Sequence, residues 1–323
     1  MSTADHRFAY LTSVTHGGFL NSPSLAERPD APVVVAGVAW DGATTNRPGA
    51  RFGPFAIRRA SHMLGDGSHP LFDVSPAEST ADLGDIALPN TSLASMRATL
   101  EPLAAPLIAA HHLVWLGGDH SITLPLLRAY RAHHGRSLAL VHFDAHCDTW
   151  PDHAGEPSGH GTWLREAVAE GLVDPRLTVQ FGIRSPAQRT IRDYIPDRGG
   201  MLFSGRDLRG LAGAAQLLEV CGAVRGRLGP ERTPVYLSLD IDCLDPAYAP
   251  GTGTPEPGGL STSQVMTLLE ELYDLNWIGM DLCEVAPAYD HAELSSAAAA
   301  TLIWTYLCGR MAREKAGIAI DLA

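Results

Sequence analysis

Short apolar runs alternate with longer segments of helical periodicity along most of the chain. The apolar runs are rich in β-branched residues and predict strands at residues 31–40, 112–116, 138–143, 177–183, 234–239 and 278–283. The segments between them carry apolar residues at helical spacing and predict helices at residues 55–64, 96–110, 122–133, 162–170, 211–227, 262–272 and 293–315. Several of these strands are apolar throughout, as is typical of strands that are covered on both faces.

The alternation of strands and helices predicts the fold class. It indicates an α/β fold with three layers, α/β/α, in which a mainly parallel sheet is flanked by helices. We expect a single domain over residues 1–323, with an N-terminal extension of about residues 1–30, because large α/β domains reach this length. The Pro- and Gly-rich segment 249–259 suits neither regular element and follows a strand end, which predicts a structured loop at the active site.

Composition and charge narrow the classes of function. The formal net charge of -12, from 24 basic and 36 acidic residues, disfavours nucleic acid and anionic membrane surfaces and mildly favours cationic ligands. The 5 cysteines form no CxxC pair and residues 1–15 lack the apolar core of a signal peptide, so we expect a cytoplasmic protein. The longest uncharged stretch, residues 294–309, is too short and too rich in alanine to span a membrane.

Three polar clusters lie at the carboxyl ends of predicted strands, at residues 117–121 (GGDHS), 144–148 (DAHCD) and 238–246 (SLDIDCLDP). Open α/β sheets bind their ligands at this edge. Alternate residues of an extended chain point to one side, so Asp144, His146 and Asp148 share a side, and Asp240 and Asp242 repeat the spacing. Taken singly, each cluster is also explained by an ordinary turn or helix cap.

Together the clusters predict a metal centre. Four carboxylates gathered in one pocket repel one another unless cations neutralise them, and two divalent ions would balance four such charges. The carboxylates are those of Asp144, Asp148, Asp240 and Asp242. The imidazoles of His120 and His146 add nitrogen ligands, and a set of oxygen and nitrogen donors without thiolate suits manganese and also accepts iron, cobalt or zinc.

The three clusters, in this order, resemble the ureohydrolase family, which includes arginases, agmatinases and guanidino-acid hydrolases. Further matching segments lie at residues 47–58 (RPGARFGPFAIR), 160–175 (HGTWLREAVAEGLVDP), 244–260 (LDPAYAPGTGTPEPGGL) and 279–290 (GMDLCEVAPAYD). The match runs from about residue 36 to the C-terminal helix and looks more like agmatinase than arginase. It implies an arginase-like fold and two Mn²⁺ per subunit, one held by His120, Asp144, Asp148 and Asp240 and the other by His146, Asp144, Asp240 and Asp242.

The resemblance also implies a reaction, the hydrolysis of a guanidino group, with agmatine giving putrescine and urea as the leading expectation. A water or hydroxide between the two metals would attack the guanidinium carbon, because the cations lower its pKa. His160 resembles the family histidine that shuttles a proton to the leaving amine. Glu284 matches the family glutamate that holds the guanidinium by paired hydrogen bonds, although a turn-capping role would also explain it.

Substrate specificity is expected to lie in the loop 149–159 (TWPDHAGEPSG). Its polar candidates are Asp152, His153 and Glu156. The terminal ammonium of agmatine favours Asp152 or Glu156 as a partner, whereas a guanidino acid favours an Arg or Lys, and the loop contains neither. Ser158 and Gly159, just before the shuttle histidine, depart from agmatinases that carry an acidic residue there, which keeps 4-guanidinobutanoate or 3-guanidinopropanoate as an alternative substrate.

Two further classes of protein share some of these features. A single-metal amide hydrolase of the deacetylase type shares the fold but lacks part of this ligand set. A metal-binding but catalytically idle regulator of polyamine enzymes would have no need of His160 and Glu284 beside the ligands. Because ureohydrolases assemble as trimers or hexamers, the resemblance also implies a homo-oligomer.

Overall fold

The computed structural model describes residues 17–65, 67–211, 213–229 and 233–317. Residues 1–16 of the expected N-terminal extension lie outside this range. Within residues 17–30, Phe19 and Leu20 are buried, and the backbone N–H of Phe19 donates to Asp82 Oδ2 over 2.8 Å.

A single sheet forms the centre of the molecule. Its strands are β1 (Val33–Val38), β2 (Thr80–Asp85), β3 (His112–Gly117), β4 (Leu138–Phe143), β5 (Val173–Phe181), β6 (Met201–Phe203), β7 (Val235–Asp240) and β8 (Trp277–Cys283). They lie in the order β2-β1-β3-β8-β7-β4-β5-β6, and every pairing between these described strands is parallel. The predicted mainly parallel sheet is therefore confirmed.

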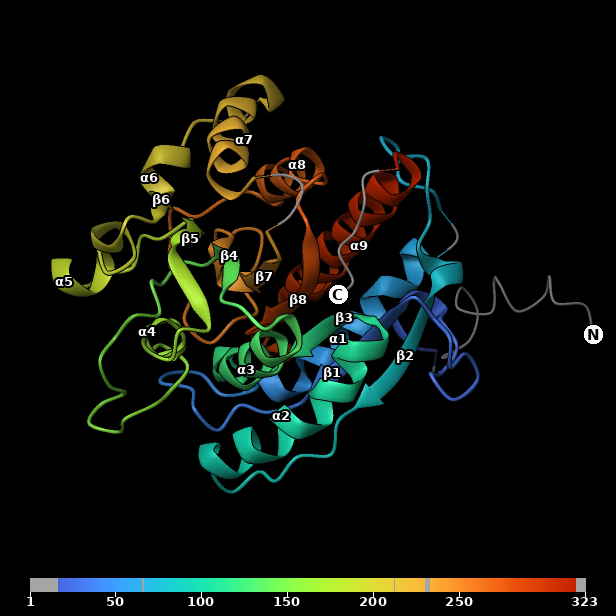
Figure 1. The fold of residues 1–323 in the computed structure, drawn as a ribbon, viewed down its shortest axis with the longest axis horizontal. Helices are drawn as coiled ribbons and strands as arrows, with labels where there is room; N and C mark the ends of the chain where they lie inside the picture. Colours follow the sequence, from blue (N-terminus) through green and yellow to red (C-terminus); the bar gives the residue numbers. More distant parts are fainter. Residues whose placement is uncertain (1–16, 66, 212, 230–232, 318–323) are drawn as a thin grey trace, which may run out of the picture.

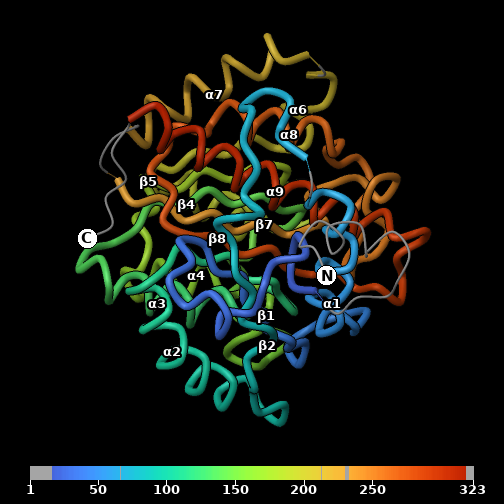
Figure 2. Tube along the Cα trace, turned by 90° about the vertical axis from the view of Figure 1, so that its right-hand side faces the viewer, coloured from blue at the N-terminus to red at the C-terminus, as the bar shows by residue number. Residues whose placement is uncertain are grey.

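Helices cover both faces of the sheet. They are α1 (Gly53–Ser61), α2 (Leu93–Ala110), α3 (Thr123–His134), α4 (Trp163–Ala169), α5 (Arg189–Arg192), α6 (Gly205–Leu208), α7 (Ala214–Leu228), α8 (Thr262–Glu271) and α9 (Leu294–Lys315). On one face α7, α8, α9 and α1 pack in a row, and on the other α2, α3 and α4 do so (Figure 1). Figure 2 again shows α2 and α3 on one side of the strands and α7 and α8 on the other, which confirms the three-layer architecture.

The strands divide their side chains between two hydrophobic cores. Val33 and Val35 of β1 belong to the core under α7, α8 and α9, whereas Val34 and Ala36 belong to the core under α2, α3 and α4. Successive side chains of a strand point to opposite faces, so a strand that lies between two cores must be apolar at every position. This is the physical reason for the continuous apolar runs in the sequence.

The predicted elements are present with small shifts, and the strands that were missed lie at the sheet edges. β2 (TADLGD) and β6 (MLF) each pair on one side only, and the second half of β2 is partly exposed, so neither needs a long apolar run. Helix α2 begins at Leu93 and not at residue 96, because the hydroxyl of Ser92 caps it by accepting the N–H of Ser95. Among the residues that the structure describes, no helix has the length and apolar character to cross a membrane.

Candidate active site

Four neighbouring strands in the middle of the sheet, β3, β8, β7 and β4, carry the predicted site residues at their carboxyl ends. His120 lies in a short 3-10 helix (His120–Ile122) after β3, and its neighbour Asp119 caps this helix by accepting the N–H of Ser121. Asp144 directly follows β4, Asp240 ends β7, and Glu284 directly follows β8. Side chains that are far apart in the sequence are thus brought to one edge of the sheet, as parallel pairing requires.

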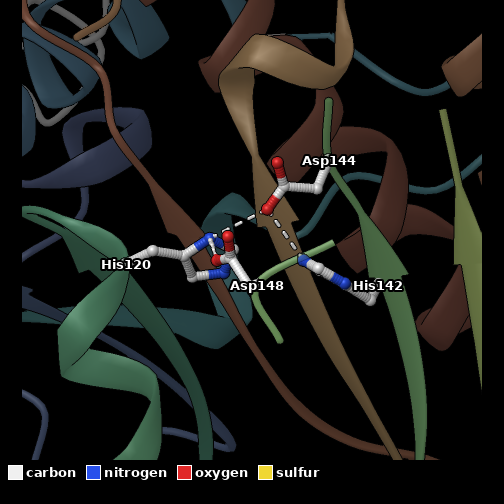
Figure 3. Close-up of side chains that lie close together, drawn as sticks. All are labelled: His120, His142, Asp144 and Asp148. Atoms are coloured by element: carbon white, nitrogen blue, oxygen red, sulfur yellow. Dashed lines mark hydrogen bonds and ion pairs between the residues drawn. The ribbon is translucent and has the colours of Figure 1, made fainter. Parts of the chain in front are cut away.

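One group of ligand atoms surrounds Nδ1 of His120. This nitrogen lies 3.2 Å from Asp144 Oδ2, 3.2 Å from Asp148 Oδ2 and 3.3 Å from Asp240 Oδ2. It is buried and makes no hydrogen bond among the described residues. Figure 3 shows the His120 ring and the carboxylates of Asp144 and Asp148 turned toward one point, with the His142 ring against Asp144 from another side. A cation at this point would satisfy all four atoms.

A second group surrounds Nδ1 of His146. This nitrogen lies 3.3 Å from Asp144 Oδ1 and 3.0 Å from Asp242 Oδ2. Asp144 therefore turns one oxygen to each histidine, which is the placement that its predicted bridging role requires. Asp240 turns Oδ2 to His120 and accepts the N–H of Asp242 on Oδ1, so the second bridge, through Asp240, stays a prediction.

The pKa shifts show the electrostatic cost of this cluster without cations. Burial, followed by repulsion from Asp242 and Asp144, raises the pKa of Asp240 well above its usual range. Burial also opposes a charge on His146, but Asp242 and Asp144 raise the pKa of this imidazole well above its usual value. Without cations the cluster therefore favours a proton on Asp240 and on the His146 ring, and divalent cations would displace such protons on binding. The residues present fit a two-cation centre.

A second layer of buried polar groups orients the ligands, and the sequence reasoning did not find it. Nε2 of His120 lies 2.7 Å from Ser238 Oγ, and this hydroxyl donates to Asp281 Oδ1 over 2.7 Å. Nε2 of His142 donates to Asp144 Oδ2 over 2.8 Å, and the amide of Gln180 lies 3.2 Å from the other ring nitrogen. His142 and Ser238 stand two residues before Asp144 and Asp240, so the same period-two spacing was a signal for both.

We expect the variant Ser238→Ala to bind metal about tenfold more weakly while keeping its fold. The substitution removes the partner that fixes the His120 ring, and losing such outer partners typically costs ~10- to 100-fold in metal affinity. Metal titration followed by calorimetry measures this effect. Ser263→Ala, at an exposed position of α8, is the matched control. Equal metal affinity of both variants would remove Ser238 from the orientation of His120.

A cavity of about 230 Å³ opens beside the ligand cluster. His146, Asp148 and Asp240 form its inner part, and the loop that was predicted to set specificity forms its outer part. The lining residues from that loop and its flanks are Trp150, Asp152, His153, Ala154, His160, Gly161 and Thr162. Among the residues that the structure describes as lining the cavity, none is Arg or Lys.

The two acidic loop residues are placed differently. Asp152 lines the cavity, and its Oδ1 also accepts the N–H of Gly155 in the turn of the loop. Glu156 is exposed, pairs with the backbone of His153, and is not part of the cavity lining. Of the two, the structure therefore brings only Asp152 to the place where a substrate tail would lie.

His160 and Glu284 form a buried pair at the cavity. The Nδ1 of His160 lies 2.8 Å from Glu284 Oε1, which also accepts the backbone N–H of His120 over 2.9 Å. Burial opposes a charge on His160, but the Glu284 carboxylate raises the pKa of this imidazole to about 9. Glu284 Oε2 is buried and has no hydrogen-bond partner among the described residues. Glu284 itself lies behind His160 and is not part of the cavity lining.

Two residues of this site have a strained backbone. Asp148 has a φ of 53° and Glu284 a φ of 67°, both in the left-handed region that residues other than glycine rarely adopt. Such strained positions persist where the surrounding structure holds them, and they cluster at functional sites. The fold and the site together define an α/β protein with a candidate metal centre of buried carboxylates and imidazoles at the carboxyl edge of a parallel sheet.

Comparisons with known proteins identify the family. Residues 31–309 match the model of the arginase family. The chain is 40% identical over 311 residues to an agmatinase of Serratia proteamaculans, covering 94% of this chain and 95% of that protein. It resembles the crystal structure of a hypothetical agmatinase from Burkholderia thailandensis, with a TM-score of 0.83, 39% identity and coverage of 93% and 92% of the two chains. Proclavaminate amidino hydrolase from Streptomyces clavuligerus gives a TM-score of 0.81 with 36% identity, covering 93% and 98%.

The chain belongs to the arginase family. This confirms the predicted ureohydrolase membership and decides against the amide hydrolase of the deacetylase type. The individual ligand and catalytic roles remain predictions that the geometry supports.

Proposed function

We propose that the protein hydrolyses agmatine to putrescine and urea with two Mn²⁺ ions at this site. The observation that carries the substrate assignment is the lining of the cavity. Its outer part offers the carboxylate of Asp152 to a cationic tail, and no Arg or Lys among the described lining residues is placed to receive a carboxylate. The similarity to agmatinases over nearly the whole chain supports the same assignment.

The ligand atoms suggest how the cations would be held. His120, Asp144, Asp148 and Asp240 would hold one ion, and His146, Asp144, Asp240 and Asp242 the other. When bound, such ions lower the pKa of water and so supply a nucleophile near neutral pH. The absence of a thiolate among these donors favours manganese over softer metals.

The chain's own residues would bind the guanidinium and move a proton. Glu284 Oε2 is buried and has no hydrogen-bond partner among the described residues, so it would accept the N–H groups of a guanidinium that reaches past His160, since Glu284 does not line the cavity itself. His160, protonated at neutral pH, would donate a proton to the leaving amine, which departs poorly without one. Nε2 of His160 accepts the backbone N–H of Thr45 over 3.2 Å and lies 2.8 Å from the Thr45 hydroxyl, which can both donate and accept and would therefore pass the proton between the ring and the leaving amine.

A guanidino acid is the second candidate substrate. It is favoured by the similarity to proclavaminate amidino hydrolase, whose coverage of this chain equals that of the agmatinase structure. For such a substrate a positive group from outside the described lining residues would have to reach the cavity.

Urea release from four compounds in parallel tests the proposal. We expect the manganese-loaded protein to release urea chiefly from agmatine, and far less from 4-guanidinobutanoate, 3-guanidinopropanoate or arginine. A metal-stripped sample should release none. Preferential hydrolysis of a guanidino acid would reassign the substrate, and the absence of urea from all four would overturn the proposed activity.

We also propose that the protein acts as one domain in a cytoplasmic homo-oligomer, a trimer or a hexamer. The side chains of Phe52 and Phe55 are 63% and 64% exposed, and large exposed apolar side chains are typical of subunit contacts. Light scattering of the purified protein measures the number of subunits.

A further inference from the structure

Gly159, directly before His160, lies against the ring of His153. A Cβ atom on residue 159 would stand 2.2 Å from Nδ1, 2.3 Å from Cγ and 2.6 Å from Cβ of His153, which is much closer than unbonded atoms approach. The φ of Gly159 is not in the left-handed region, so the backbone conformation does not demand glycine here. Glycine is required at this position for space, and the group that takes the space is the ring of His153.

A chain of hydrogen bonds and an ion pair fixes the backbone of Gly159. Its N–H donates to Thr162 Oγ1 over 2.9 Å, and this hydroxyl donates to Glu166 Oε1 over 2.6 Å. Glu166 in turn pairs with Arg97 of α2 over 2.9 Å, and Arg97 is buried. The ring of His153 makes no hydrogen bond with any described residue, so a side chain at position 159 would displace the whole His153 side chain, Cβ included, while the backbone of residue 159 keeps its hydrogen bonds.

The ring of His153 lies on the route that a substrate tail would follow. It lines the cavity beside His160, with the two ring centroids 5.8 Å apart and the planes at 73°. The inner lining residue Asp240 is buried, whereas Asp152 is exposed, so the cavity leads from the ligand cluster past His153 to solvent. Burial and the charge on His160 lower the pKa of His153, so the imidazole is neutral at pH 7 and offers a lone pair.

We propose that His153 is a specificity-determining residue that binds the terminal ammonium of the substrate, and that Gly159 is glycine in order to admit its ring. The inference rests on the proposed function, in which the substrate is a guanidino compound with a cationic tail. The neutral imidazole accepts one N–H of the ammonium, and the neighbouring residue Asp152, whose carboxylate would attract the same charge, also lines the cavity. Gly159 acts through His153 and is a positioning residue.

A double-mutant cycle tests the proposal, with agmatine and 1-guanidinobutane as substrates. The second compound has the same chain length and lacks the ammonium. We expect His153→Ala to raise the KM for agmatine about tenfold, the scale of one hydrogen bond to a charged group, with little change in kcat. The KM for 1-guanidinobutane should not change. Gly159→Ala should raise the KM for agmatine similarly in the wild-type background and should add nothing in the His153→Gly background, which also removes the Cβ that would stand 2.6 Å from the new side chain.

A matched control separates the effect of the contact with His153 from the effect of any Gly→Ala substitution. Gly222→Ala makes the same substitution in α7, where no atom lies within 4 Å of the added Cβ, and it should behave as wild type. Additive effects of the two substitutions on KM, or an equal loss with 1-guanidinobutane, would overturn the proposal. If Gly159→Ala does not fold, the His153→Ala variant with the two substrates still decides the role of the ring.

The proposed ammonium site can be tested even if the proposed activity is wrong. If the wild-type protein releases urea from no guanidino compound, the proposed activity is wrong. Binding of 1,4-diaminobutane to the metal-loaded wild-type, single and double variants, measured by calorimetry, then tests the ammonium site directly. Weaker binding to both single variants, with no further loss in the double variant, supports it, and equal binding to all four proteins overturns it.

Discussion

The variant Asp144→Asn is expected to lose nearly all turnover together with bound metal. Asp144 turns one oxygen to His120 and the other to His146, so it is the carboxylate that joins the two groups of ligands. An asparagine keeps the shape but removes the charge and replaces one oxygen by an N–H₂ group that cannot bind a cation. Removing one partner from a buried charge cluster costs roughly 3–5 kcal/mol, so we expect metal affinity to fall by ~10²- to 10⁴-fold. Metal analysis after gel filtration and urea release measure the two effects.

The matched control for this prediction is Asp193→Asn. Asp193 pairs with the exposed guanidinium groups of Arg189 and Arg192, and such surface pairs contribute little. Its metal content and turnover should equal those of the wild type. Two bound ions and normal turnover in Asp144→Asn would contradict the two-cation centre.

The second large effect is expected for Glu284→Gln, which should lower kcat/KM for agmatine by at least ~10²-fold, the scale of a lost buried charge-assisted pair. One oxygen of Glu284 already accepts from His120 and His160, and the other has no partner in the part of the chain that the structure describes. A glutamine amide must turn its N–H₂ group either toward these donors or toward the guanidinium, so one donor faces another in both orientations. Metal content should stay normal, because Glu284 is not a proposed ligand.

The split between kcat and KM distinguishes two roles of Glu284. If this carboxylate only positions His160, kcat should fall and KM should stay unchanged. If it also holds the guanidinium, as we predict, KM should rise as well. The variant His160→Asn, which removes the proton donor alone, provides the reference for a loss in kcat without a rise in KM.

The general outline of the protein could be read from local patterns. Strands that are buried on both faces must be apolar at every position, and this made β3, β4, β7 and β8 visible in the sequence. The polar residues that follow these strands stand out against that background, so the candidate ligands from His120 to Asp242 could be predicted from the sequence. Edge strands β2 and β6 were missed because they pair on one side only.

The contacts within the site were decided by the tertiary structure. The order of strands across the sheet, which places β3, β8, β7 and β4 side by side, arises from crossover connections that no local pattern encodes. It brings Ser238 to His120, and Asp281 to Ser238, over separations of 118 and 43 residues. The sequence by itself thus determined which residues could bind metal and roughly where the chain turns. Only the folded sheet decided which side chains meet, that Glu284 stands behind His160, and that Gly159 makes room for His153, because each of these contacts joins segments whose distance is fixed by packing and not by sequence spacing.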